Sequence, residues 1–130
     1  MDIEKFKEIF RGLNVAYGKF IPSDTNDAGK LQGDNKIIRQ PDGLPDKLWE
    51  DHLNGTNSLG IIPIDENNEC RWGCIDIDQY PLDHKVLIEK IRKLKLPLVV
   101  CRSKSGGAHC FLFTTAWVEA KDMQSTLQEI

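Results

Sequence analysis

The chain lacks any long hydrophobic segment. None of its 130 residues belongs to an apolar run of the roughly 18–20 residues that a membrane-spanning helix requires. The N-terminal sequence Met-Asp-Ile-Glu-Lys-Phe-Lys-Glu is charged and has no apolar core of the kind found in signal peptides. Internal repeats and low-complexity stretches are also missing. We therefore expect a cytoplasmic protein with no membrane partner.

Cysteine is scarce, and its spacing excludes the common zinc knuckle. No two cysteines are separated by two residues, and all four lie in or beside apolar, strand-like runs: Cys70, Cys74, Cys101 and Cys110. The favoured interpretation is four buried, reduced thiols in a reducing compartment. A zinc site that combines some of them with His84 or His109 is the alternative.

The chain also lacks a large excess of charge of either sign. Its formal net charge of −3 argues against a protein that holds DNA by bulk electrostatics alone. Basic residues nevertheless concentrate from Lys85 to Lys104, where seven of them accompany a single acid, Glu89. Those up to Lys95 are explained by a solvated helix face. Arg102 and Lys104 flank a glycine-rich segment and are candidates for phosphate contacts.

Two carboxylates occupy alternate positions of an apolar run, Cys74-Ile75-Asp76-Ile77-Asp78. In a strand, residues two apart point to the same face, with Cα atoms about 6.5–7 Å apart. Asp76 and Asp78 therefore share an exposed face, opposite the isoleucines. Paired carboxylates repel each other, and a hard divalent cation relieves that repulsion. The pattern predicts a Mg²⁺ or Mn²⁺ site, and two surface acids at a strand end are the alternative.

A second segment, Arg-Ser-Lys-Ser-Gly-Gly-Ala-His, occupies residues 102–109. Glycines allow a backbone to approach a phosphate closely, and lysine and serine side chains supply charge and hydrogen-bond donors. The candidate phosphate-binding residues are Ser103, Lys104, Ser105, Gly106, Gly107 and His109. An ordinary hairpin turn and a core histidine, on the same face as Phe111 and Phe113, are the structural alternatives.

Hydrophobic spacing and turn residues predict an α+β fold of short elements. The predicted helices are residues 2–13, a short helix opened by Pro45-Asp46 and closed by Asn54-Gly55, and residues 84–95 and 120–130. The predicted strands are residues 16–21, 36–39, 59–64, 70–78, 98–102 and 108–114. Most of residues 22–43 is predicted as loop, and the strands 59–64 and 70–78 are predicted to form a hairpin.

The order of elements from residue 70 onward indicates a known arrangement. Strand, helix, strand, strand and helix follow one another, which is a split βαββαβ sheet of RNA-recognition-motif shape without its last strand. We therefore expect one truncated domain over residues 1–130. Residues 1–58 would form a small N-terminal α/β module. Residues 59–130 would form the hairpin and the βαββα(β) half.

The acid pair, the helix after it and the serine-glycine segment ending in histidine resemble the catalytic half of the archaeo-eukaryotic primase (primase-polymerase) superfamily. The resemblance covers residues 59–114, extends to 44–58, and is closest to the domains of phage and mobile-element replication proteins. That family carries a third acid on a later strand. Glu119 and Asp122 come too early for it, so we expect the chain to end before that motif.

The resemblance implies a DNA primase or polymerase that transfers nucleotides to a 3′-hydroxyl during DNA replication. Asp76 and Asp78 would bind two Mg²⁺ or Mn²⁺ ions and, with His109, form the catalytic group. The serine-glycine segment and His109 would hold the nucleoside triphosphate. The implied partners are nucleoside triphosphates, a DNA template and primer, and a helicase domain or protein. A fragment without the third acid could be inactive alone.

Two other classes of function fit parts of the sequence. A metal-dependent nuclease could use the same acid pair, but it would have less use for a glycine loop with lysine and serine. A non-catalytic nucleotide-binding or nucleic-acid-binding module of RNA-recognition-motif shape, or an inactive remnant, is the other alternative. A module that binds nucleic acid would need exposed aromatics on the sheet for base stacking. Trp72, on the face of the acids, is the candidate for that role.

Overall fold

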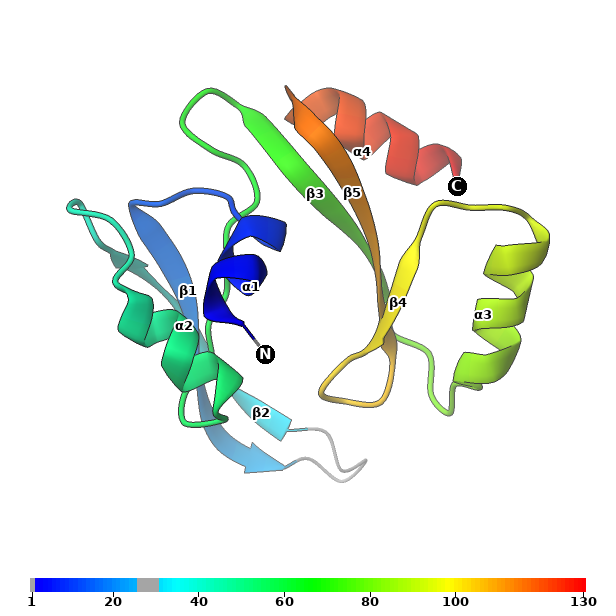
Figure 1. The fold of residues 1–130 in the computed structure, drawn as a ribbon. Coiled ribbons are helices and arrows are strands. Elements are labelled where there is room, and N and C mark those ends of the chain that lie inside the picture. Colours follow the sequence, from blue (N-terminus) through cyan, green and yellow to red (C-terminus); the bar gives the residue numbers. More distant parts are fainter. Residues whose placement is uncertain (1, 26–30) are drawn as a thin grey trace. The chain divides into compact units, whose positions relative to one another are not determined.

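Figure 1 shows the computed structural model, which describes residues 2–25 and 31–130. Within these residues the chain forms four helices and five strands, so the α+β class predicted from the sequence is confirmed. The chain divides into two compact units, Met1–Glu69 and Cys70–Ile130. None of the helices in the described ranges is long and apolar enough to cross a membrane.

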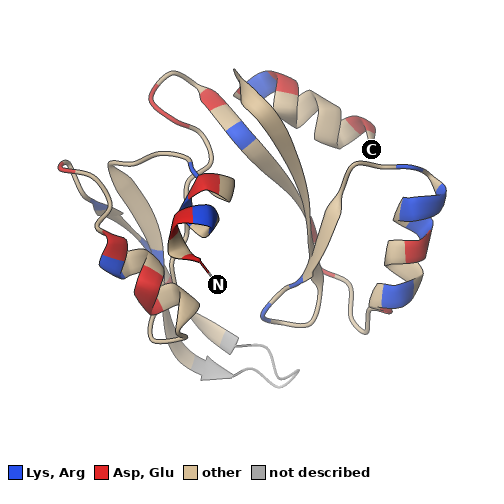
Figure 2. Cartoon of the chain, viewed as in Figure 1, with Lys and Arg blue, Asp and Glu red and all other residues tan. Residues whose placement is uncertain are grey.

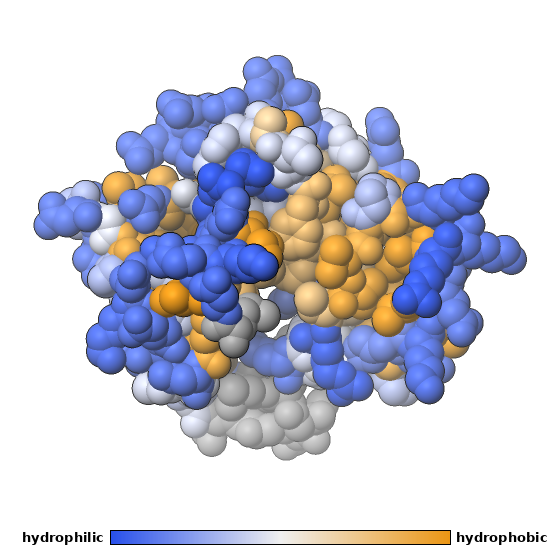
Figure 3. All heavy atoms as spheres, in the orientation of Figure 1, coloured by the Kyte–Doolittle hydropathy of each residue, from blue (hydrophilic) through white to orange (hydrophobic). Residues whose placement is uncertain are grey.

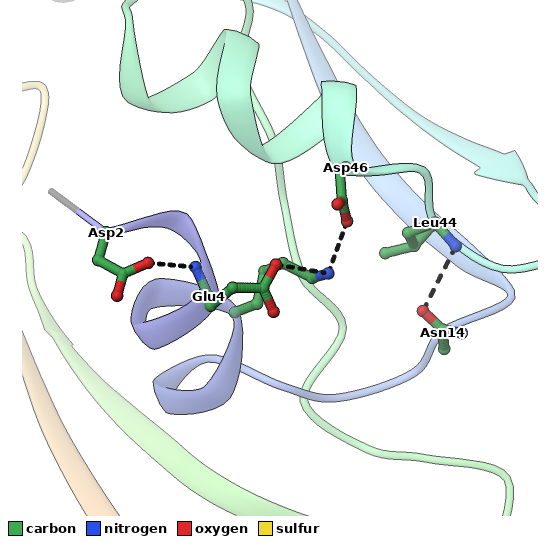
Figure 4. A network of polar contacts seen from close by, with 6 residues as sticks. Asp2, Glu4, Asn14, Leu44 and Asp46 are labelled. Carbon is green, nitrogen blue, oxygen red and sulfur yellow. Dashed lines mark hydrogen bonds and ion pairs between the residues drawn. The ribbon is translucent and has the colours of Figure 1, made fainter.

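Two helices of the first unit pack against each other. They are α1 (Ile3–Ile9) and α2 (Asp46–Leu53). The Phe6 ring lies edge-on to the Trp49 ring, with 5.8 Å between ring centroids, and Trp49 is buried. The Lys7 ammonium group contacts the Asp46 carboxylate at 2.6 Å, a contact that also raises the pKa of Lys7 (Figure 4). An aromatic contact and an ion pair therefore join the two helices.

Helix α1 is shorter than the predicted span of residues 2–13. The amide of Leu13 donates to the carbonyl oxygen of Ile62 at 2.8 Å instead of continuing the helical ladder. A Cβ atom on Gly12 would lie 2.2 Å from the same carbonyl oxygen, so only glycine permits this approach. A tertiary backbone contact ends the helical segment that the hydrophobic spacing alone would extend.

The prediction of a loop over most of residues 22–43 is wrong for residues 22–25 and 31–35, whereas the strand predicted at 36–39 is present as part of a longer strand. Strands β1 (Ala16–Thr25) and β2 (Leu31–Arg39) form an antiparallel ribbon, with Ala16 opposite Arg39. Glycine, asparagine and aspartate are unfavourable in isolated strands, but cross-strand pairing overrides that preference here. Residues 26–30 of the expected loop lie outside the described residues.

The predicted hairpin of residues 59–64 with 70–78 is also wrong. Gly60 exchanges two backbone hydrogen bonds of 2.7 Å with Gly18, so the first segment pairs with β1. Pro63, which has no amide donor, disfavours a regular strand at this point. The expected turn does form, because the Asp65 side chain accepts hydrogen bonds from the amides of Asn67 and Glu69.

The second unit contains a three-stranded sheet with the order β3-β5-β4. Its strands are β3 (Glu69–Ile77), β4 (Val99–Arg102) and β5 (Ala108–Glu119), and its helices are α3 (His84–Lys93) and α4 (Ala120–Glu129). The last strand in sequence lies between the other two, as in the first three strands of a split βαββαβ sheet. The predicted helices and strands after residue 78 are all present, with β5 longer than expected.

Side chains from both helices cover one face of this sheet. Ile91 of α3 packs with Ala108 and Cys110 of β5 in the core of the unit. A Cβ atom on Gly73 of β3 would lie 2.8 Å from the side chain of Met123 in α4, so that helix crosses the same face of β3. Apolar atoms fill the space between the ribbons of β4 and α3 (Figures 1 and 3). Polar side chains on the opposite face of β3 are therefore left outside this core.

The outer side of α3 is basic, as the sequence predicts for a solvated helix face. Figure 2 shows the lysines and arginines spread along this helix. The Asp83 side chain caps the helix by accepting from the amide of Val86 at 3.2 Å. The exposed basic residues of the helix are Lys85, Lys90, Arg92 and Lys93.

Candidate functional site

The acid pair lies where β3 ends. Asp76 is in the strand, Asp78 follows directly after its last residue, and both side chains are exposed. Ile75 and Ile77 pack against the core on the opposite face, as the alternation predicts. The local sequence fixes this arrangement because the strand must bury its isoleucines, which turns the carboxylates toward solvent.

His109 lies opposite the first of these acids. The imidazole Nε2 atom is 3.7 Å from the Oδ1 atom of Asp76, and the His109 side chain is 43% exposed. The histidine ring also lies edge-on to Phe111, which in turn stacks with Phe113. His109 is therefore a half-exposed residue on the predicted face, rather than one enclosed in the core.

Contacts along the two strands show that β3 and β5 run antiparallel. The Thr114 hydroxyl donates to the carbonyl of Arg71 at 3.0 Å, and farther along the pair His109 faces Asp76. Residue numbers thus fall along β5 as they rise along β3. This direction brings the start of β5, and the glycine segment before it, to the end of β3 where the acids lie.

The glycine segment forms the turn between β4 and β5. The Ser103 amide donates to the Gly107 carbonyl, and the Gly106 amide donates to the Ser103 carbonyl, each at 3.1 Å. Gly106 has a φ angle of +91°, which favours glycine. A Cβ atom on Gly107 would lie 2.2 Å from the carbonyl oxygen of Ile77. The glycines therefore have a structural role, which is to let this turn close tightly against the end of the acid strand.

The polar side chains of this turn differ in exposure. Lys104 is exposed, whereas Ser103 and Ser105 are half-buried. We name residues 103–107 the glycine loop. Its serines and lysine come from the same short turn that touches β3, so the predicted phosphate-binding group and the acid pair belong to one end of the sheet.

Sequence reasoning missed Tyr80, which connects the two parts of the site. Its hydroxyl donates a short hydrogen bond to the Oδ1 atom of Asp78. This bond raises the pKa of Tyr80, while a hydrogen bond from the Ser105 side chain acts in the opposite direction. The sequence marks Tyr80 only as part of a strand-breaking Tyr-Pro pair, and no periodic pattern signals its contacts.

His84 is the second residue that sequence reasoning left out of this site. Its Nε2 atom lies 2.8 Å from the carbonyl oxygen of Gly107, in a half-buried contact between the first residue of α3 and the glycine loop. The two residues are far apart in sequence, so only the fold reveals this contact. The imidazole therefore supports the backbone of the loop from the start of the helix.

The cysteines are free thiols in the described residues, but they are not all buried. Cys70 and Cys110 are buried, whereas Cys101 is exposed on the edge strand β4, which corrects the expectation of four buried thiols. Partial burial raises the pKa of Cys74 to about 11, with a further contribution from the negative charge of Asp76. Cys74 therefore stays protonated at neutral pH.

The donor set at the acid pair suits one kind of metal. Within residues 2–25 and 31–130, no three histidine, cysteine or acidic side chains gather closely enough to hold a metal ion. This gives the zinc alternative no ligand set among the described residues, since structural zinc needs four. Mg²⁺ requires fewer protein ligands than zinc, because it binds through one or two carboxylates together with water and substrate phosphates. Two exposed carboxylates beside a loop that carries a lysine and two serines fit that requirement.

Comparisons with known proteins identify the family. A model of the archaeo-eukaryotic primase domain of TOTE conflict systems matches residues 2–130. No curated protein matches the chain. The family match spans both units, including the residues before the range 44–114 that carries the resemblance seen in the sequence. The chain therefore belongs to the archaeo-eukaryotic primase superfamily, as a domain of the TOTE conflict-system type.

Proposed function

We propose that this domain binds a nucleoside triphosphate with divalent cations and transfers its nucleotidyl group to a 3′-hydroxyl on a DNA primer. Family membership supports the class of reaction. The observation that carries the assignment of residues is the placement of His109, 3.7 Å from Asp76, at the end of β3 against which the glycine loop closes.

The proposed roles follow from the chemistry of each side chain. Asp76 and Asp78 would hold Mg²⁺ or Mn²⁺, which when bound lowers the pKa of an attacking hydroxyl and stabilises charge on the leaving pyrophosphate. Lys104 supplies a positive charge and Ser103 and Ser105 supply hydroxyl donors for the triphosphate. His109 has an accessible ring nitrogen that can donate to a phosphate oxygen.

The wider setting of this reaction is part of the same proposal. A DNA template and primer would lie beside the acid pair, and a helicase domain or protein would supply single-stranded template. The occurrence of the family in conflict systems supports a mobile-element or phage setting over chromosomal replication.

A primer-extension assay tests the proposal. The chain is incubated with Mn²⁺, each class of nucleotide in turn and a labelled primer on a DNA template, and Asp76→Asn is run as the matched variant. Extension that requires the metal and is lost in the variant supports nucleotidyl transfer. Extension that persists in Asp76→Asn, or that occurs equally with EDTA, contradicts the assignment of the acids.

A second function is favoured by one specific observation. The described residues contain only two carboxylates at this site and no larger group of metal-binding side chains. A domain with two acids could bind nucleotide without transferring it. Metal-dependent binding of ATP in calorimetry, without extension of any primer, would establish this non-catalytic alternative.

A further inference from the structure

Residues 80–84, which follow the acid pair and include the first residue of α3, contact the glycine loop through two side chains. His84 reaches the carbonyl oxygen of Gly107 at 2.8 Å. Tyr80 donates to the carboxylate of Asp78 and has Ser105 as a second polar partner. The residues that would bind metal and the residues that would bind phosphate are thus joined by a segment that itself belongs to neither group.

The contact of His84 has a defined direction. A carbonyl oxygen can only accept a hydrogen bond, so the Nε2 atom of His84 must carry a proton and donate it. The Gly107 carbonyl also accepts the amide of Ser103, which closes the turn. The carbonyl oxygen of Gly107 therefore accepts two hydrogen bonds, one from within the loop and one from the first residue of α3. The second donor links the loop conformation to a rigid helix.

The contact of Tyr80 restrains a carboxylate. Its hydroxyl donates a hydrogen bond to the Oδ1 atom of Asp78, which fixes the orientation of this carboxylate. Hydrogen bonds of this kind orient carboxylates that bind a metal ion. Removing such a hydrogen bond commonly lowers the affinity for the metal roughly tenfold or more. The side chain of Ser105 is a second hydrogen-bond partner of the Tyr80 hydroxyl, so Tyr80 contacts the glycine loop as well as Asp78.

We propose that Tyr80 and His84 are positioning residues. They hold the glycine loop and the Asp78 carboxylate in the relative positions that a metal-bound triphosphate requires. This inference rests on the proposed function. His84 acts on the loop alone, whereas Tyr80 acts on both the loop and the acid. The two residues should therefore affect phosphate affinity and metal affinity in different proportions.

Amide hydrogen exchange tests the role of His84 without any ligand. In the 130-residue chain, His84→Leu should speed exchange of the Ser103 and Gly106 amides about three- to tenfold, the net effect of losing one hydrogen bond. His84→Gln should restore slow exchange, because its side-chain amide can donate at the same position. His52→Leu is the matched control and should leave these amides unchanged. Unchanged exchange in His84→Leu overturns the inference.

Binding measurements then separate the two residues. With Mn²⁺ and ATP, His84→Leu should weaken ATP binding about tenfold while leaving the affinity for Mn²⁺ alone unchanged. Tyr80→Phe, which removes only the hydroxyl, should weaken both. If both variants bind ATP with the same affinity as the wild-type chain, the inference is contradicted. Failure of the wild-type chain to bind ATP contradicts the proposed function instead, and the exchange rates then decide whether the loop contact exists.

Discussion

The Nε2 atom of His109 lies 3.7 Å from the Oδ1 atom of Asp76, across the antiparallel pair β5 and β3. Both side chains are partly exposed, so their mutual attraction contributes little to stability. The proposed function instead assigns this imidazole and this carboxylate to ligand binding. Mutations of these two residues should therefore affect function much more than folding.

Substitution of the acids should abolish metal binding with little cost to the fold. Asp76→Asn and Asp78→Asn each remove a charge that would hold the cation but keep the side-chain volume. We expect loss of Mn²⁺-dependent ATP binding in calorimetry, and a change in unfolding free energy within about 1 kcal/mol, because the acids are exposed. Binding that persists in both variants would contradict the metal site.

Substitution of the loop lysine should affect the phosphates selectively. Lys104→Ala removes a charged donor, so affinity for ATP with Mn²⁺ should fall about tenfold, whereas affinity for adenosine should not change. Lys85→Ala is a control of the same charge on the outer side of α3 and should have a much smaller effect. Equal losses in the two variants would indicate general electrostatic attraction rather than a phosphate contact.

Helix α4 should be required for the stability of the second unit. Met123 is 6% exposed and lies over Gly73. Met123→Ala should lower the unfolding free energy by about 2–5 kcal/mol, as expected for a large-to-small change in a packed core. Gln124→Ala, at an exposed neighbouring position, should change it by no more than about 0.5 kcal/mol. Urea unfolding followed by circular dichroism measures both.

Thiol labelling should depend steeply on pH at Cys74. Its pKa is raised from 9.0 to about 11, first by burial and then by the charge of Asp76. In a Cys101→Ser background, alkylation of Cys74 should accelerate about tenfold per pH unit until the pH approaches 11, since the thiolate is the reactive form. Peptide mapping by mass spectrometry follows the rate. A plateau near pH 8 would contradict the raised pKa.

The same shift has a consequence for stability. A thiol with a higher pKa in the folded chain than in the unfolded chain favours folding while it is protonated, at pH below about 9. That contribution is lost as the pH rises from 9 toward 11, because the unfolded chain ionises first. Unfolding free energies measured across this interval should decline less in Cys74→Ala than in the wild type.

The parts of the structure that depend on local patterns could be predicted from the sequence. The alternation around Asp76 and Asp78 predicted which face of β3 carries the acids, because burying the isoleucines leaves no other choice. Helix α2 begins and ends close to the predicted Pro-Asp and Asn-Gly signals. Strands β4 and β5 were predicted for the same reason, and the hairpin turn offered as the structural alternative for the glycine segment does join them.

Features that depend on distant partners could not be predicted. Strand β2 extends beyond the predicted residues 36–39 because it pairs with β1, despite a composition that favours loops. The segment around Gly60 pairs with Gly18 instead of β3, and nothing in its own sequence distinguishes the two partners. The contact of His84 with Gly107 joins a side chain to a backbone carbonyl, and such contacts leave no periodic signal.

The two glycines of the loop should tolerate substitution very differently. At Gly106 a Cβ atom would have no other atom within 4 Å, and the only obstacle is the positive φ angle, so asparagine or aspartate should survive there at reduced frequency. At Gly107 any side chain meets the backbone of Ile77. In a saturation library selected for function, position 107 should retain glycine alone. Adjacent identical residues would thus carry distinct evolutionary constraints, one torsional and one steric.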